Sequence, residues 1–392
     1  MQLSPNIRHT LYVSSTRADY GLMRDTLKAI DSHPGLRLSI LATGMHLSKD
    51  YGNTIKDIES DGFHIIDQLP TLASDDTPLA MAQSIGSAVL SMSEAFEKIR
   101  PNFVILEGDR GEFLAAAIAA AHMGIAVVHV SGGDVTGTMV DESIRHAITK
   151  LSHIHFPGTD LSARRILNMG EDPWRIHMVG TPGSNVKAEL RMEADELERL
   201  LQINLSQRIF LVIQHPVTSE VEEAPRQMRE TMEAVAGFQE EMVIILPNSD
   251  AGGREMTRII NEYEHLSYVH TFSNLPRPAY VSLMSVASLM VGNSSSALTE
   301  APGFGLPAVN VGTRQLGRER GGNVVDVANT KEEIRRSVKQ ILVSLDNPDC
   351  RAKWNQTPYQ DINVAEQISQ VLSEIEMGPR LIQKRFYDGV SG

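Results

Sequence analysis

The sequence predicts an α/β protein, and three observations lead to this fold class. First, 392 residues are too many for one small core and suit two α/β domains of ordinary size. Second, short apolar runs alternate with amphipathic stretches, which is typical of βαβ units around a parallel sheet. Third, the alternation stops near residue 180 and restarts near residue 208. Together they predict two Rossmann-like domains with an active site in the cleft between them.

In the first half, six apolar runs predict strands and five amphipathic stretches predict helices. Pro101 and Gly124 stand where two of these helices should end, because proline interrupts a helix and glycine favours the position after it. The predicted strands are Thr10–Ser14, Arg37–Ala42, Phe103–Glu107, Ala126–Val130, His153–Phe156 and His177–Val179. The predicted helices are Gly21–Asp31, Leu79–Arg100, Glu112–Met123, Asp141–Leu151 and Ser162–Met169.

The second half repeats the pattern after a break. We expect an N-terminal domain over residues 1–180, a linker region over 181–207 that includes a charged helix at Ala194–Leu201, and a C-terminal domain over 208–360. Residues 361–392 are expected to form a helix and tail that cross back onto the first domain. The strands predicted here are Ile209–Gln214, Met242–Leu246, Tyr268–Thr271, Leu289–Val291, Ala308–Val311 and Val324–Val327.

Composition excludes several classes of protein. The net charge is −13 without a concentrated basic stripe, which argues against a nucleic-acid partner. No apolar run approaches the roughly 20 residues of a membrane span, and the N-terminus lacks a secretion signal, so we expect a cytoplasmic protein with no membrane partner. Cys350 is the single cysteine, and His153 and His155 have no third ligand nearby in sequence. We therefore expect no metal site.

No nucleotide-cofactor or nucleophile motif is present. The sequence has no G-x-G-x-x-G after a strand, no G-x-x-x-x-G-K-[ST] and no G-x-S-x-G. We therefore expect no cofactor. Five arginines nevertheless stand in or beside glycine-containing loops, where guanidinium groups suit phosphate oxygens. The alternative for any one of them is a solvated surface position. They are Arg17, Arg110, Arg314, Arg318 and Arg320.

Polar loops follow nearly every predicted strand. Ligands of open parallel sheets bind at the carboxyl ends of the strands, so these loops predict a cleft lined by their side chains. The loops begin at Ser15, Thr43, Gly108, Ser131, His215, Asn248, Asn293 and Gly312.

The loop at Gly292–Glu300 is the candidate phosphate site. Hydroxyls and free N–H groups at a helix start suit a diphosphate, and Arg314 follows the next strand. Ser294 or Ser295 as an ordinary N-cap is the alternative. Glu300 can accept hydrogen bonds from ribose hydroxyls. His215 faces the cleft in this layout, where it can transfer a proton or hold a phosphate.

Four carboxylates are expected around one point of the cleft. Asp141 and Glu142 begin a helix just after the glycine-rich loop that carries Asp134, and Asp109 follows a neighbouring strand. Clustered carboxylates raise one another's pKa and can separate into acid and base roles. The alternative is that acids at a helix start, with i,i+4 partners, only stabilise the helix. His129 is read as a core histidine.

Eight motifs, in order over about residues 8–327, carry a family resemblance. They are Arg17–Tyr20, His46 with Asp50–Thr54, Gly108–Arg110, Gly132–Gly133, Ser143–Lys150, Gln214–Thr218, Gly292–Ser295 and Gly312–Gln315. Together they resemble the hydrolysing UDP-N-acetylglucosamine 2-epimerases of sialic-acid and related nonulosonate synthesis. The resemblance implies a GT-B-like architecture, a nucleotide-sugar substrate and a two-step reaction. UDP leaves to give a 2-acetamidoglucal, and water then adds to yield free N-acetylmannosamine or an analogue.

The resemblance also implies roles for single residues. Asp109 and Asp141 match catalytic acids, and Asp134, Glu142 and His215 are further catalytic candidates. The nucleotide-binding candidates are Arg17, His215, Asn248, Ser294, Ser295, Glu300 and Arg314. The substrate-binding candidates are Asp19, His46, Arg110, Ser131, Arg145 and His146. A homodimer or higher homo-oligomer is common in the family and is expected here.

Two residues depart from the family pattern. Related epimerases have Glu or His where Ser131 stands, and Asp where Asn185 stands. Asp134 or Glu142 is expected to compensate for the first change. Either change is consistent with another substrate, such as UDP-2,4-diacetamido-trideoxy-glucose or GDP-GlcNAc. The other classes left open are a non-hydrolysing epimerase, a GT-B glycosyltransferase and a nucleotide-sugar sensor.

Overall fold

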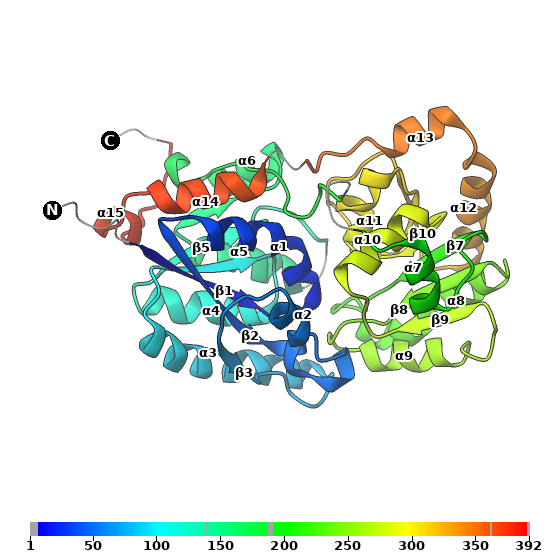
Figure 1. The fold of residues 1–392 in the computed structure, drawn as a ribbon, viewed down its shortest axis with the longest axis horizontal. Coiled ribbons are helices and arrows are strands. Elements are labelled where there is room, and N and C mark those ends of the chain that lie inside the picture. Colours follow the sequence, from blue (N-terminus) through cyan, green and yellow to red (C-terminus); the bar gives the residue numbers. More distant parts are fainter. Residues whose placement is uncertain (1–6, 138–139, 187–190, 361–362, 390–392) are drawn as a thin grey trace.

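The computed structural model describes residues 7–137, 140–186, 191–360 and 363–389, and they build two parallel sheets of six strands each. Figure 1 shows the two sheets in separate halves of the molecule, each flanked by helices. Among the described residues no helix is long and apolar enough to cross a bilayer. The predicted fold class, two Rossmann-like α/β domains in a GT-B-like arrangement, is confirmed.

The first sheet has the strand order β3-β2-β1-β4-β5-β6. Buried apolar clusters cover both of its faces, which explains why its central strands are continuous hydrophobic runs. The strands are β1 Arg8–Ser14, β2 Leu36–Thr43, β3 Ile65–Leu69, β4 Phe103–Glu107, β5 Ala126–Val130 and β6 Ile154–Phe156. The helices are α1 Arg17–Ser32, α2 Ile55–Ser60, α3 Pro78–Ile99, α4 Gly111–His122, α5 Val140–Leu151 and α6 Asp160–Asn168.

The second sheet has the order β12-β11-β10-β7-β8-β9, which repeats the topology of the first. Its strands are β7 Ile209–Ile213, β8 Glu241–Ile245, β9 Val269–Phe272, β10 Leu289–Gly292, β11 Ala308–Val311 and β12 Val324–Val327. Its helices are α7 Ala194–Leu201, α8 Ala224–Ala236, α9 Gly253–Asn261, α10 Arg277–Val286, α11 Ser296–Thr299, α12 Lys331–Ser344 and α13 Pro348–Trp354.

Two predictions about strands in the first half were wrong. The strand expected at His177–Val179 is absent, and the chain makes an isolated bridge there, between Ile176 and His155. Strand β3 was not predicted, because its five residues mix apolar and polar side chains and are only half-buried at the sheet edge. Both errors concern the margins of the sheet, where burial gives the sequence little periodicity.

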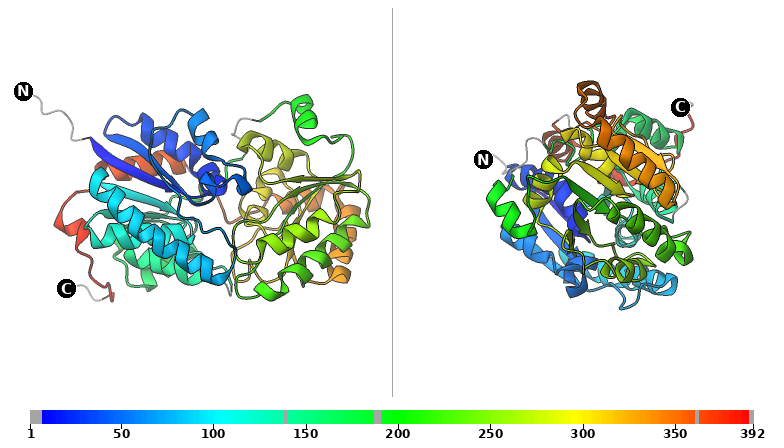
Figure 2. Two further views of the ribbon diagram at one scale, coloured as in Figure 1. Left: turned by 90° about the horizontal axis from the view of Figure 1, so that it is seen from below. Right: turned by 90° about the vertical axis from the view of Figure 1, so that its right-hand side faces the viewer.

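The last described helices lie on the first half of the molecule. Helix α14, Val364–Glu374, packs on α1, and α15, Pro379–Ile382, follows it (Figure 1). Val364, Ile368 and Leu372 join the core of the first sheet. Figure 2 shows these red helices beside the blue N-terminal elements from other directions. The chain therefore crosses between the halves twice, whereas the exact domain boundaries stay a prediction.

Candidate active site

The strand order of each sheet reverses between two central strands, and this point fixes where a ligand can bind. In the first sheet the neighbouring strands are β1 and β4, and in the second they are β7 and β10. The loops after these four strands line one shared cavity between the halves, represented by Thr16, Gly108, His215 and Ser294. The cavity therefore has a wall from each half, and we call them the first wall and the second wall.

Asp19 anchors the first turn of α1 at the base of the first wall. Its carboxylate accepts hydrogen bonds from the Ser14 hydroxyl at 2.6 Å, the Thr16 backbone N–H at 2.6 Å and the Tyr12 hydroxyl at 3.0 Å. His46 is buried behind it, with Nε2 2.9 Å from the Ser14 hydroxyl oxygen. Asp19 lines the cavity and His46 does not. These donors satisfy the charge of Asp19 and fix the first turn of α1, which begins at Arg17.

Arg17 joins the two walls. Its guanidinium carbon lies 5.5 Å from the centre of the Tyr280 ring, which belongs to α10 of the second half. Burial lowers the pKa of Arg17 from its usual value, although arginine remains protonated at neutral pH. A half-buried cation at the cavity surface is well suited to bind an anionic ligand.

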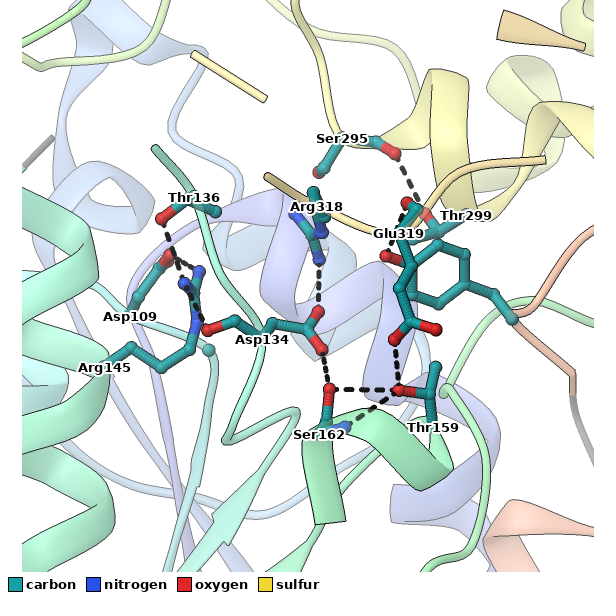
Figure 3. Close-up of polar contacts among 12 residues, drawn as sticks. Asp109, Asp134, Thr136, Arg145, Thr159, Ser162, Ser295, Thr299, Arg318 and Glu319 are labelled. Atoms are coloured by element: carbon teal, nitrogen blue, oxygen red, sulfur yellow. Dashed lines mark hydrogen bonds and ion pairs between the residues drawn. The ribbon is translucent and has the colours of Figure 1, made fainter. Parts of the chain in front are cut away.

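Asp109 forms an ion pair with Arg145, which also donates a hydrogen bond to the Thr136 hydroxyl at 3.0 Å (Figure 3). Arg145 comes from α5 and is buried, so its ion pair holds Asp109 in one position. Both residues line the cavity. An ion-paired carboxylate stays ionised at neutral pH and can accept a proton or stabilise a developing positive charge.

Asp134 and Glu142 were expected in the cleft, but the structure gives both other contacts. The Asp134 carboxylate accepts hydrogen bonds from Ser162 at 2.7 Å and Arg318 at 2.9 Å (Figure 3). Glu142 accepts one from the Thr136 backbone N–H at 2.7 Å and lies 3.0 Å from His146. Among the described residues that line the cavity, Asp134, Glu142 and His146 are absent. Asp134 instead ties the two walls together through Arg318.

Asp141 lies in the first turn of α5 and is half-buried. Burial, followed by the nearby charge of Asp250, raises the pKa of its carboxyl to about 6, while Arg314 and Arg110 act in the opposite direction. Asp250 and Arg314 belong to the second half, so Asp141 lies near the boundary between the walls. It is not among the described residues that line the cavity directly. A carboxyl with this pKa can exchange a proton near neutral pH.

Glu107 is a cavity carboxyl that the sequence analysis assigned only to a strand. It is the last residue of β4, is 9% exposed and lines the cavity. Burial, followed by the charge of Asp19, raises its pKa to about 7, and a hydrogen bond from Ser131 partly offsets this. Ser131 follows β5 with a φ of 61°, a left-handed conformation that is rare without glycine. Backbone conformations of this kind cluster at functional sites, so Glu107 and Ser131 are candidate site residues.

The second wall presents hydroxyls at the start of α11. Ser294, Ser295 and Ser296 line the cavity, and the Ser294 and Ser296 oxygens are 2.9 Å apart. Gly292 makes the approach of this loop possible, because its φ is 130° and a Cβ there would lie 2.0 Å from a backbone oxygen of β7. Arg314 donates a hydrogen bond to the Asn293 backbone oxygen at 3.3 Å.

His215 is a neutral group in the second wall. Burial and the neighbouring Arg314 and Arg110 hold its pKa well below its usual value. Its Nδ1 accepts a hydrogen bond from the Asn248 backbone N–H at 3.2 Å, so in the neutral ring the proton resides on Nε2. His215 therefore offers a hydrogen-bond donor and is poorly suited to act as an acid.

Glu300 has a partner that the sequence did not indicate. It forms an ion pair with Arg277, the first residue of α10, and both line the cavity. Tyr280 lies one turn further along the same helix and also lines it. The sequence shows only that an arginine directly follows Pro276. The fold shows that the helix beginning at Arg277 faces the cavity.

Twelve of the seventeen predicted site residues line the cavity. They are Arg17, Asp19, Asp109, Arg110, Ser131, Arg145, His215, Asn248, Ser294, Ser295, Glu300 and Arg314. The other five, as described above, are His46, Asp134, Asp141, Glu142 and His146. In the described part of the chain no three His, Cys, Asp or Glu residues gather as a metal site. His155 pairs with Glu171 at 3.1 Å, and His129 contacts the Gly108 carbonyl oxygen at 2.8 Å, both outside the cavity lining.

Two doubly wound domains with a cavity between their strand-reversal points define the GT-B-like class of folds. Residues 28–373 match the UDP-N-acetylglucosamine 2-epimerase family, so the chain belongs to this family. The family predicted from the motifs is thereby confirmed.

The comparisons also identify similar individual proteins. The chain is 39% identical to a UDP-N,N'-diacetylbacillosamine 2-epimerase (hydrolyzing) of Legionella pneumophila, over 96% of this chain and 99% of that protein. It is 34% identical to a GDP/UDP-N,N'-diacetylbacillosamine 2-epimerase (hydrolyzing) of Campylobacter jejuni, over 81% and 84%. Its fold is similar to a crystal structure of UDP-GlcNAc 2-epimerase from Neisseria meningitidis bound to UDP-GlcNAc, with TM-score 0.77, 18% identity, and coverage of 93% and 99%.

Proposed function

We propose that this protein is a hydrolysing 2-epimerase that converts a UDP-linked 2-acetamido sugar to UDP and the free 2-epimer. The observation that carries the proposal is the contrast between the walls of the cavity. The first wall presents the carboxylates of Glu107 and Asp109, and the second presents serine hydroxyls and Arg314. This contrast suits a reaction that expels a diphosphate from a carbon next to a proton-transfer site.

Departure of UDP needs stabilisation of negative charge on the diphosphate. The hydroxyls of Ser294 and Ser295 can donate hydrogen bonds to it, and Arg314 supplies positive charge. Neutral His215 can donate from Nε2 without carrying a charge of its own. Glu300, held by Arg277, is proposed to accept hydrogen bonds from the ribose. Arg17 and Asn248 complete the nucleotide side of the cavity.

The first chemical step is an elimination. The C1–O bond breaks and its electron pair leaves with UDP, while the C2–H electrons form the C1=C2 bond of a 2-acetamidoglucal. Because the C2 proton is not acidic in the intact substrate, C1–O cleavage must run ahead and create positive character at C1. Asp109, paired with Arg145, is proposed to stabilise that charge and to accept a proton.

The second step adds water to the glycal. C2 takes a proton on the face opposite to the one it lost, and C1 takes the oxygen of water, whose proton passes to a carboxylate. Asp141, with a pKa raised to about 6, is a second group able to exchange a proton here. Ser131, Arg110 and Arg145 are proposed to contact the sugar.

The favoured substrate is UDP-2,4-diacetamido-2,4,6-trideoxy-glucose, because the two relatives at 39% and 34% identity are named for the diacetylbacillosamine substrate. UDP-GlcNAc is the second candidate, since the similar solved structure is bound to it. Homodimerisation and a cytoplasmic location remain predictions from the sequence.

A nucleotide-release assay over UDP- and GDP-linked sugars tests the proposal. We expect UDP and a free sugar with inverted C2, formed fastest from the diacetamido substrate. A UDP-linked epimer without free UDP would instead identify a non-hydrolysing epimerase. UDP release that requires an added acceptor would identify a glycosyltransferase, and tight binding with no turnover would identify a sensor.

A further inference from the structure

Inversion at C2 requires two proton-transfer groups, because one carboxyl cannot act on both faces of the sugar ring. This requirement rests on the proposed function. Four carboxyl groups line the cavity among the described residues, and they differ in how strongly they are held. They are Asp19, Glu107, Asp109 and Glu300.

Three of the four are held by several hydrogen bonds or by an arginine. Asp19 accepts hydrogen bonds from backbone and hydroxyl groups of its own helix start. Asp109 is paired with Arg145, and Glu300 with Arg277. These partners fix the three carboxylates in position.

The Glu107 carboxyl has a hydroxyl, rather than an arginine, as its hydrogen-bond partner. It is hydrogen-bonded to the Ser131 hydroxyl, and Arg145 and Arg318 act on it only as more distant charges. Strands β4 and β5 are neighbours in the sheet, with Glu107 opposite Val130 in the register, so Ser131 lies one position beyond its partner. Glu107 ends β4, one of the two strands between which the strand order reverses, and both Glu107 and Ser131 line the cavity with Asp109.

We propose that Glu107 is a catalytic carboxyl that carries one of the two proton transfers at C2, with Ser131 orienting it. In the elimination, a carboxylate takes the proton from C2 while the C2–H electrons form the double bond. In the hydration, a protonated carboxyl gives a proton to C2 while the double-bond electrons form the new C–H bond. Glu107, whose pKa is raised to about 7, is present in both forms at neutral pH and can serve either step.

This assignment replaces the compensation that the sequence suggested. Asp134 and Glu142 were expected to make up for the serine at position 131, but neither is among the described residues that line the cavity. Asp134 accepts hydrogen bonds from Arg318 and Ser162, and Glu142 accepts one from the Thr136 backbone N–H. Glu107 supplies a carboxyl directly beside Ser131 instead.

The test is steady-state turnover of Glu107→Gln with the substrate on which the wild-type enzyme is fastest. We expect kcat to fall by about 100-fold or more, with the Kd for UDP changed by less than about threefold. The limb near pH 7 in the wild-type pH–rate profile should vanish in the variant. Glu241→Gln is the matched control: it removes a carboxyl that opens strand β8 and lies 3.0 Å from His270, and should leave kcat within about twofold.

Exchanging the residues at positions 107 and 131 tests whether the carboxyl of Glu107 has a chemical role or only a structural one. The double variant Glu107→Ser with Ser131→Glu returns a carboxyl to the same pair of neighbouring strands, and we expect at least about tenfold more activity than in Glu107→Ser alone. A kcat of Glu107→Gln within threefold of wild type, or an equal loss of UDP affinity, would overturn the inference alone. A wild-type enzyme that releases no UDP from any sugar would overturn the proposed function, and the inference with it.

Discussion

The two walls of the cavity hold their charges in different ways. In the first wall, cations lie beneath carboxylates: Arg145 supports Asp109, and the carboxylates present their oxygens to the cavity. The second wall has one such pair, Glu300 with Arg277, and adds the hydroxyls of Ser294 and Ser295 and the guanidinium of Arg314. The difference indicates that proton transfer belongs to one wall and the leaving diphosphate to the other. Variants of Asp109 and Glu107 in the first wall should therefore change kcat, and variants of Arg314 in the second should change nucleotide affinity.

The largest effect is expected for Asp109→Asn. The amide keeps the shape but cannot accept a proton or stabilise positive charge at C1, so kcat should fall by about 1,000-fold. Titration calorimetry should give a Kd for UDP within about threefold of wild type. An equal loss of UDP affinity would contradict this role and would show that Asp109 binds the nucleotide.

Asp141→Asn should lower kcat by about 100-fold with UDP binding nearly intact. Since the folded pKa is raised to about 6, the ionised base predominates above that pH, and wild-type kcat should rise as pH increases through 6. The variant should lose this limb. A wild-type profile that is flat between pH 5 and 7 would contradict the role given to Asp141.

Arg314→Ala should weaken UDP binding by about 30-fold, as expected for loss of charge-assisted hydrogen bonds to phosphate. Its effect on kcat at saturating substrate should be smaller than that of Asp109→Asn. Arg314→Lys keeps the charge without the planar fork and should recover part of the affinity. Unchanged UDP affinity in Arg314→Ala would contradict the claim that the second wall binds the diphosphate.

The ion pair between Asp134 and Arg318 joins the walls and is mostly buried. Removing either partner leaves an uncompensated charge, so Asp134→Asn and Arg318→Ala should each lower the free energy of unfolding by about 3 kcal/mol. In a double-mutant cycle followed by thermal unfolding, the double variant should be less destabilised than the sum of the singles. Simple additivity would show that the pair does not connect the walls energetically.

The smallest effect is a pH-dependent stability change in Glu107→Gln. The folded pKa of Glu107 is raised by burial to about 7, above the ordinary value of 4.5, so the folded state favours the protonated form. Its contribution to stability is complete below pH 4.5 and is lost as pH rises through 7. The glutamine variant does not ionise, so its Tm relative to wild type should be a few degrees higher at pH 8 than at pH 4.5. An equal Tm difference at both pH values would contradict the raised pKa.

The sequence predicted the regular elements and the site loops for the same physical reason. Buried parallel strands are apolar runs, and the loops after them converge at the strand-reversal points, which placed Asp109, His215 and Ser294 around one cavity. Strand β3 lacked this signal because it lies half-buried at an edge.

The errors in the site came from contacts that only tertiary structure creates. Glu107 ends an apolar strand, so strand periodicity suggested a buried position without a role. Arg277 reaches the cavity because α10 packs beside it. Asp134 could not be separated from Asp109 by sequence, because its partners Ser162 and Arg318 are distant along the chain.

The most direct test of the account is one NMR time course in heavy water with UDP-2,4-diacetamido-2,4,6-trideoxy-glucose, repeated with UDP-GlcNAc. The account predicts free UDP together with a free sugar that has inverted configuration at C2 and carries deuterium there. Release of UDP with a gluco-configured sugar that keeps its C2 proton would contradict it, because simple hydrolysis would then explain the products without proton transfer at the first wall.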